Sequence, residues 1–193
     1  MPSERPAFET EVRELVSRVL DGVLAAPTGA VPAPSVPAGT RDRIAIGADH
    51  GGFELKRSLI AKLAEAGYEV HDVGTDSAEA CDYPDFAHAV ARQVAKGSCG
   101  AGIMIDGAGI GSAMTANKVP GVRAAACYDL STARNSREHN RANVLTLGAG
   151  LTGPALAWQI VQEWLATPWG GDRHLRRVAL INEIEEIYAR SEA

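Results

Sequence analysis

The sequence predicts an α/β protein, a Rossmann-like three-layer sandwich built on a five-stranded parallel sheet. Two patterns lead to this prediction. From Arg43 onward, short apolar segments of strand length alternate with longer segments whose apolar residues recur with helical spacing. Strands and helices that alternate in this way form a parallel sheet, because right-handed crossovers carry the helices over both of its faces. We therefore expect one α/β domain over residues 42–193.

The predicted elements follow one another in order along this domain. The strands are short apolar runs at residues 43–50, 68–74, 101–106, 122–129 and 143–150. The helices are amphipathic or apolar segments at residues 51–67, 85–97, 110–118, 130–140, 153–166 and 174–190. Ligands of parallel sheets bind beyond the carboxyl ends of the strands, so a site is expected among the residues that follow each strand.

Residues 1–41 differ from this domain in composition. Residues 1–26 are predicted to form an amphipathic helix, because Pro6 suits a helix start and the apolar residues from Phe8 onward lie in steps of one, three and four. Residues 27–41 contain four prolines and two glycines and are predicted to be a semi-extended linker. The helix either folds back on its own domain, forms an oligomer contact, or docks on another protein or shell. Its polar face is not basic, which disfavours a membrane surface.

Composition excludes several classes of function. The net charge is -5 and the Lys and Arg residues are scattered, so nucleic acid is not an expected partner. No apolar run reaches the roughly 18 residues that a membrane span needs. Cys81, Cys99 and Cys127 have no CxxC spacing and suit reduced thiols in a cytoplasmic compartment. No Cys/His cluster has the spacing of a metal site, so no metal is expected.

Two strand ends carry candidate chemistry. Asp49 and His50 follow the first strand, where they either serve a ligand or form a turn that caps the next helix. The segment DGAGIG, residues 106–111, follows the third strand. It is neither a Walker loop nor a complete dinucleotide fingerprint, because Ser112 stands where that fingerprint needs glycine. Its glycines form either a simple tight turn or, with the following helix N-terminus, a nest for an oxyanion or a phosphate.

Two further segments add an acid and positive charge. His139 and Asn140 end a predicted helix, where a histidine can also simply stabilise the helix dipole. Arg173, Arg176 and Arg177 share one helical face, which suits either an anionic ligand such as phosphate or a solvated interface. Taken together, these features suit proton transfer next to the carbonyl of a small phosphorylated ligand.

The same segments resemble the ribose-5-phosphate isomerase B / galactose-6-phosphate isomerase family. The resemblance runs from about Arg43 to Ile187 and rests on GADHGGFELK, DYPDFA, the GxGxG turn with its helix ending in ANK, REHN followed by NVL, and GGDRHLRRV. It implies aldose–ketose isomerisation of a sugar phosphate through a cis-enediol, without a cofactor or a metal. It also implies a homodimer or tetramer whose active sites are shared between subunits.

The resemblance also implies roles for individual residues. Asp49 and His50 would handle the sugar and its ring opening, Tyr83 would line the pocket, and His139 would be the acid of ring opening. The anion-binding turn would be Gly107, Ala108, Gly109 and Gly111, Asn140 would contact the substrate, and Arg173 and Arg177 would bind the phosphate.

Four positions depart from the family pattern. In one branch of the family the catalytic base is a Cys at the position of Asp106, and that branch has a Thr at Ala108 and an Arg at Gly150. Another branch has a Glu at the position of Ser112. Asp106 is expected to be the base, because proton removal from carbon needs an ionised but poorly solvated group and Asp reaches about as far as Cys. The alternative is that Asp106 repels an enediolate and the chain is a sugar-phosphate-binding or scaffold subunit of a heteromeric isomerase.

The substitutions at Ala108 and Gly150 predict a reshaped pocket. The substrate would be ribose 5-phosphate or a related tetrose, pentose or hexose phosphate, with Arg134 or Arg141 as candidates to replace the missing charge. Residues 1–41 resemble the encapsulation peptides that direct enzymes into bacterial microcompartments. That resemblance predicts a shell-protein partner for residues 1–26, with the rest of the chain in the cytoplasm or inside a microcompartment.

Overall fold

A computed structural model describes residues 42–189 of the 193-residue chain. The predicted helix over residues 1–26 and the whole predicted linker over residues 27–41 lie outside the described residues.

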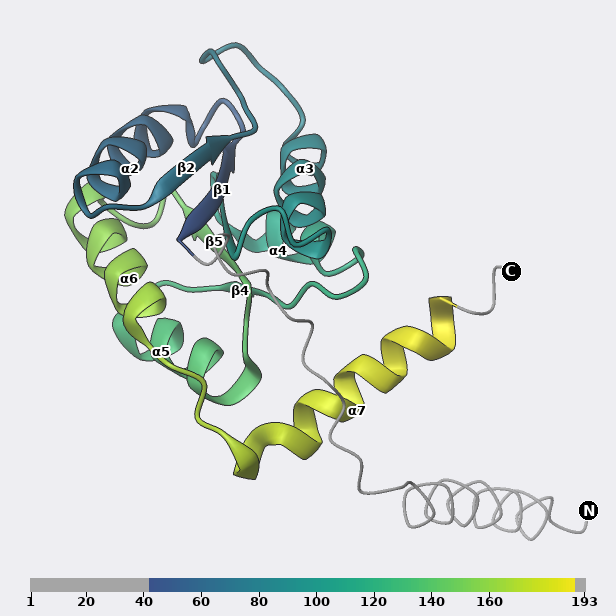
Figure 1. Ribbon diagram of the computed structural model, residues 1–193. Helices are drawn as coiled ribbons and strands as arrows, with labels where there is room; N and C mark the ends of the chain where they lie inside the picture. The colour runs from purple at the N-terminus through teal and green to yellow at the C-terminus, as the bar shows by residue number, and fades with distance from the viewer. Residues whose placement is uncertain (1–41, 190–193) are drawn as a thin grey trace, which may run out of the picture. The chain divides into compact units, whose positions relative to one another are not determined.

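The centre of the structure is a parallel sheet of five strands in the order β2-β1-β3-β5-β4 (Figure 1). The strands are β1 (Arg43–Ala48), β2 (Glu69–Asp72), β3 (Ala101–Asp106), β4 (Ala124–Ala126) and β5 (Val144–Gly148). The three central strands are almost wholly buried, which explains why their sequences are continuously apolar rather than alternating. The predicted five-stranded parallel sheet is confirmed.

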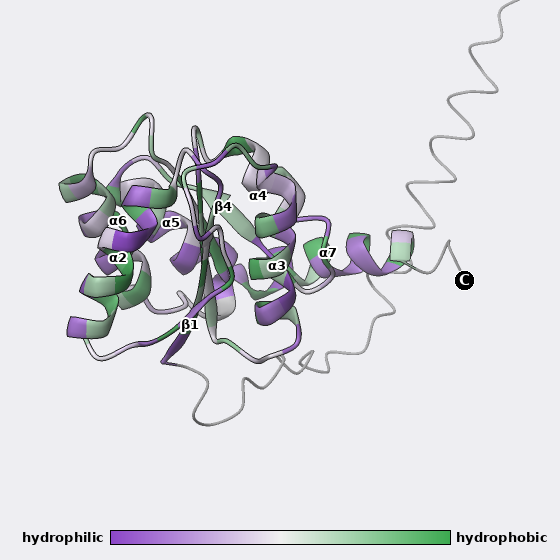
Figure 2. Ribbon diagram, turned by 90° about the horizontal axis from the view of Figure 1, so that it is seen from above, coloured by the Kyte–Doolittle hydropathy of each residue, from purple (hydrophilic) through white to green (hydrophobic). Residues whose placement is uncertain are grey.

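Helices cover both faces of the sheet and make three layers (Figure 2). On one face, α2 (Phe53–Glu65), α5 (Leu130–Asn140) and α6 (Pro154–Ala166) pack against the side chains of Ile46, Ile103 and Leu145. On the other face, α3 (Tyr83–Ala95) and α4 (Ile110–Ala116) pack against Ala45 and Met104. Alternate residues of each central strand therefore contribute to two separate apolar cores. The α/β class and the Rossmann-like arrangement are as predicted.

Most predicted element boundaries differ from the observed ones by one to three residues, and two of these differences have local reasons. Helix α3 begins at Tyr83, two residues before the predicted start, because Pro84 fits the first turn of a helix, where no N–H partner is needed. Strand β4 has only three residues, because Asp129 leaves the strand to cap α5. Its side chain accepts a hydrogen bond from the Thr132 N–H at 2.7 Å, and the Thr132 hydroxyl completes a capping box.

The last helix, α7 (Asp172–Ala189), passes the segment that leads into β4. Glu185 accepts a hydrogen bond from the Gly121 N–H at 2.9 Å, and Asn182 accepts one from Arg123 at 3.3 Å. Several of its apolar side chains remain exposed, among them Leu180, Ile181, Ile184 and Ile187. Across residues 42–189, no helix combines the length and apolar character needed to cross a membrane.

Candidate active site

The carboxylate of Asp106 is turned back into the glycine turn that follows β3. Its Oδ1 accepts hydrogen bonds from the N–H groups of Ala108, at 2.8 Å, and Gly109. Its Oδ2 accepts from the N–H of Ser112, at 3.1 Å, and from the Ser112 hydroxyl. Asp106 is only 5% exposed. An ionised carboxylate has about four lone-pair sites, so these four donors occupy all of them.

The turn around this carboxylate is fixed by close packing against β5. Gly109 has a φ of 82°, and a Cβ there would lie 3.0 Å from the carbonyl carbon of Leu147, so only glycine suits the position. The Gly109 carbonyl accepts a hydrogen bond from the Thr146 hydroxyl at 2.7 Å. The backbone N–H groups of Gly107, Ile110 and Gly111 find no acceptor within residues 42–189. The turn therefore offers three donors to a ligand besides those that bind Asp106.

Asp49 stands beside this turn, at the end of β1. Its side chain is 7% exposed, and its Oδ1 accepts a hydrogen bond from the Gly52 N–H at 3.0 Å. Its own N–H donates to the Ile105 carbonyl at 3.1 Å, which joins the ends of β1 and β3. A Cβ on Gly51 would lie 3.4 Å from Asp49 Oδ1 and 3.9 Å from Gly107 N, so the Asp49 carboxylate is close to the turn.

His50 and Tyr83 complete this group from neighbouring segments. The Nδ1 atom of the exposed His50 lies 3.3 Å from both the backbone N and the carbonyl oxygen of Cys81 and 4.0 Å from its sulfur. The ring of Tyr83 covers Gly111, where a Cβ would lie within 2.6–2.7 Å of ring atoms. We call this set the carboxyl-edge group, and it is made of Asp49, His50, Tyr83 and residues 106–112.

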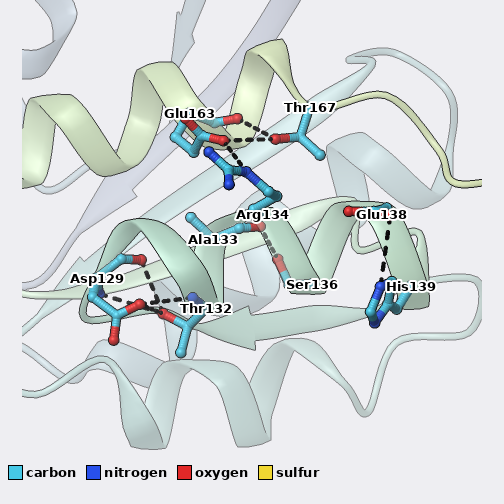
Figure 3. A network of polar contacts seen from close by, with 9 residues as sticks. All are labelled: Asp129, Thr132, Ala133, Arg134, Ser136, Glu138, His139, Glu163 and Thr167. Carbon is cyan, nitrogen blue, oxygen red and sulfur yellow. Dashed lines mark hydrogen bonds and ion pairs between the residues drawn. The ribbon is translucent and has the colours of Figure 1, made fainter.

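The other predicted residues gather where α5 ends and α7 begins. The His139 Nδ1 atom is 2.9 Å from the Asn135 side-chain nitrogen, and its Nε2 atom is 3.7 Å from a Glu138 carboxylate oxygen (Figure 3). Arg173 approaches the same carboxylate at 3.3 Å. We call this set the helix-end group, and it is made of Glu138, His139, Asn140, Arg173, His174 and Arg177.

His174 joins the two helices in this group. Its ring stacks on that of His139 with 4.3 Å between centroids, and its Nε2 accepts a hydrogen bond from Arg173 Nε at 2.6 Å. Because Nε2 accepts, the ring proton is on Nδ1, which is buried and has no partner within the described residues. Burial lowers the pKa of His174, and the positive charges of His139, Arg173 and Arg177 lower it further.

The chain does not bring the two groups together. The Asn143 carbonyl accepts a hydrogen bond from Gly102 N at 2.9 Å, so the segment that follows α5 lies at the start of β3. Asp106 lies at the other end of β3, four residues beyond Gly102 and about 13 Å away at the usual rise of a strand. Asp106 and His139 are thus at opposite edges of the sheet. The predicted site is divided into two halves within one chain.

The comparisons with known proteins agree with this fold. Residues 44–181 match the Ribose/Galactose Isomerase family. The chain belongs to the ribose/galactose isomerase family. It is 46% identical to ribose-5-phosphate isomerase B of Escherichia coli strain K12, over 75% of this chain and 97% of that protein.

Solved structures of this family are equally similar. Ribose-5-phosphate isomerase B of Clostridium thermocellum is 51% identical and superposes with a TM-score of 0.75, covering 76% of this chain and 99% of that one. The enzyme of Mycoplasma genitalium, solved with bound ribulose 5-phosphate, is 39% identical with a TM-score of 0.73, covering 75% and 96%.

The structure accounts for one position that departs from the family pattern, Gly150, and places the two arginines expected to replace the missing charge. Gly150 donates its N–H to the Gly107 carbonyl at 3.0 Å, and a Cβ at 150 would lie 2.9 Å from that oxygen, so a larger residue needs the glycine turn to shift. Arg134 is paired with Glu163 at 2.7 Å, which raises the pKa of Arg134 and leaves it poorly placed to replace a missing arginine (Figure 3). Arg141 instead lies over the Trp169 ring, 5.9 Å from its centroid, and that ring meets His174 edge-on.

Sequence reasoning missed three residues of these groups. In the sequence Ser112 stands out only as a departure from the family, although its side chain binds Asp106. Glu138 and His174 lie inside the quoted motifs, but their contacts with His139 and Arg173 depend on how α5 and α7 meet. Within residues 42–189, no cluster of three or more His, Cys, Asp and Glu side chains could hold a metal ion.

Proposed function

We propose that the protein interconverts the aldose and ketose forms of a small sugar phosphate through a cis-enediol, with Asp106 as the base and no cofactor or metal. The observation that carries this proposal is the Asp106 carboxylate, which is buried at the end of a central strand beside a turn with unpaired N–H groups. Family membership and the names of the relatives support the reaction class.

The reaction follows from the groups at this edge. Asp106 takes the proton from C2 of the open-chain aldose, and the electrons of that C–H bond form the C1=C2 double bond. The carbonyl oxygen on C1 gains negative charge, is stabilised by the free N–H groups of the turn, and takes up a proton. Asp106 then returns its proton to C1 while the C2 hydroxyl loses one, which gives the ketose.

The site would be completed by a second copy of the chain. Asp106 and the helix-end group lie at opposite edges of the sheet, so one chain alone cannot apply both to a molecule the size of a sugar phosphate. We propose a homodimer, or a tetramer built from such dimers, in which the helix-end group of one protomer faces the carboxyl-edge group of its partner. The exposed apolar side chains of α7 supply a surface for this contact.

Within the shared site, each predicted residue has a role. Asp49 and His50 would handle the sugar during ring opening, with His139 as the acid, while Tyr83 and Asn140 would contact the sugar. Arg173 and Arg177 would bind the phosphate. The small residues Ala108 and Gly150 would reshape the pocket. The substrate would then be ribose 5-phosphate or a related tetrose, pentose or hexose phosphate.

One observation favours a second candidate function. The four donors around Asp106 fill its lone pairs, which is also what a purely structural carboxylate would show. The chain would then be a sugar-phosphate-binding or scaffold subunit that works beside a base-bearing homologue. A purified homo-oligomer that isomerises a panel of aldose phosphates, and that loses this activity in Asp106→Asn, supports the isomerase. Binding without turnover across the panel supports the second function.

Residues 1–26 are proposed separately to dock on a microcompartment shell, on the grounds of their sequence pattern alone. Deletion of residues 1–40 is expected to leave isomerase activity unchanged and to abolish co-purification with shell proteins. Dissociation of the oligomer by the same deletion would instead assign these residues to a subunit contact.

A further inference from the structure

Among residues 42–189, Ser112 is the one residue that binds Asp106 through both its backbone and its side chain. It lies in the first turn of α4 with no exposed surface, and its N–H and its hydroxyl both donate to Oδ2. We propose that Ser112 is a positioning residue for Asp106: its hydroxyl orients the carboxylate for proton transfer and remains its partner after the proton has arrived. This inference rests on the proposed role of Asp106 as the base.

The chemistry of the four donors singles out this hydroxyl. Three of them are backbone N–H groups, which can only donate and which cannot turn away without moving the chain. A hydroxyl rotates about one bond and can either donate or accept. It is therefore the donor that most easily releases a lone pair of Asp106 when a proton must be taken up.

The protonated state makes the same hydroxyl necessary. Asp106 as an acid carries an O–H donor in a buried site, and a buried donor without an acceptor is costly. Among the described residues, Ser112 provides the only side-chain hydrogen bond to this carboxylate. When the Ser112 hydroxyl rotates, its oxygen can accept a hydrogen bond from the protonated Asp106, to which it donated when Asp106 was ionised. Both protonation states of Asp106 are then hydrogen-bonded without any movement of the backbone.

The test separates this role from a structural one. Ser112→Ala removes the hydroxyl and keeps the N–H contact, so kcat is expected to fall about 10- to 100-fold, as for loss of a hydrogen bond to a charged group. KM for ribose 5-phosphate should not change, because the Ser112 side chain is fully buried and its hydroxyl is bonded to Asp106 rather than open to a ligand. Ser112→Thr keeps a hydroxyl and is expected to recover most of the lost kcat.

Thr115→Val is the matched control. Thr115 is also on α4, but its hydroxyl donates to the Gly111 carbonyl at 3.0 Å and does not reach Asp106, so its loss should leave kcat unchanged. If Ser112→Ala proves unfolded by circular dichroism, Ser112→Cys is used in its place. It replaces the hydroxyl by a thiol, which is a weaker hydrogen-bond donor, and the same loss of kcat is expected.

Asp106→Asn is assayed in parallel, so that failure of the proposed role of Ser112 can be distinguished from failure of the proposed role of Asp106 as the base. A Ser112→Ala enzyme with unchanged kcat, next to an inactive Asp106→Asn enzyme, overturns the role of Ser112 and leaves the proposed function standing. Undiminished turnover in Asp106→Asn removes the proposed base, and the role of Ser112 with it. A fall in kcat for Ser112→Ala that Ser112→Thr reverses supports the inference.

Discussion

The Ser112 hydroxyl and the Ser112 N–H donate to the same oxygen of the Asp106 carboxylate. This contact ties the end of β3 to the first turn of α4 across the glycine turn. It makes the turn and the carboxylate one rigid unit. Substitutions in the turn should therefore change both the free energy of unfolding and kcat, and the two effects can be measured separately.

Stability should depend strongly on Gly109 and weakly on Gly107. Gly109→Ala places a Cβ 3.0 Å from the Leu147 carbonyl carbon at a φ of 82°, so it is expected to lower the free energy of unfolding by about 1–3 kcal/mol. Gly107→Ala is the control, because a Cβ there meets no atom within 4 Å. Urea denaturation of the two variants measures the difference, and equal loss in both would contradict the packing described for the turn.

Stability should also fall on mild acidification because of His174. Its pKa is lowered in the folded chain, so the unfolded chain binds more protons below about pH 6.5, and the stability that neutral His174 contributes is lost as the pH falls through that range. The melting temperature should therefore drop between pH 7.5 and pH 5.5. In His174→Gln this drop should be smaller, and an unchanged drop would show that another group is responsible.

The proposed sharing of sites can be tested by mixing inactive variants. Asp106→Asn disables the carboxyl-edge group and Arg173→Ala disables the helix-end group. In mixed dimers one site receives both intact halves, so co-expression should restore roughly a quarter of the wild-type activity, as expected for a two-fold dimer with random pairing. Mixing Arg173→Ala with His139→Ala, which disable the same group, should restore none. Equal recovery in the two mixtures would contradict the division of the site.

Much of the fold could be predicted from sequence because its patterns are local. The apolar run of β3 and the polar limits of α5 gave their observed bounds, residues 101–106 and 130–140. The strand expected at residues 122–129 is longer than the observed β4. At its carboxyl end the Asp129 capping box competes with strand pairing, and this box is recognised only once the structure shows the hydrogen bonds between Asp129 and Thr132.

The site was harder to predict than the fold. The sequence indicates most members of both groups but not the roles of Ser112, Glu138 and His174. The separation of the two groups depends on the strand order and on where α5 ends relative to β3. The two hydrogen bonds from Ser112 to Asp106 depend on the left-handed conformation at Gly109, which brings Ser112 back toward the strand end. A motif reveals which residues are present, whereas these contacts depend on how the chain turns between them.

In the proposed reaction, Asp106 removes a proton from carbon. The most direct measurement follows deuterium incorporation from D₂O into the substrate and product carbons of ribose 5-phosphate by nuclear magnetic resonance, for the wild-type protein and for Asp106→Asn. The wild type is expected to exchange and isomerise, while Asp106→Asn should do neither and should still bind the sugar phosphate. Exchange at the wild-type rate in Asp106→Asn would show that Asp106 is not the base.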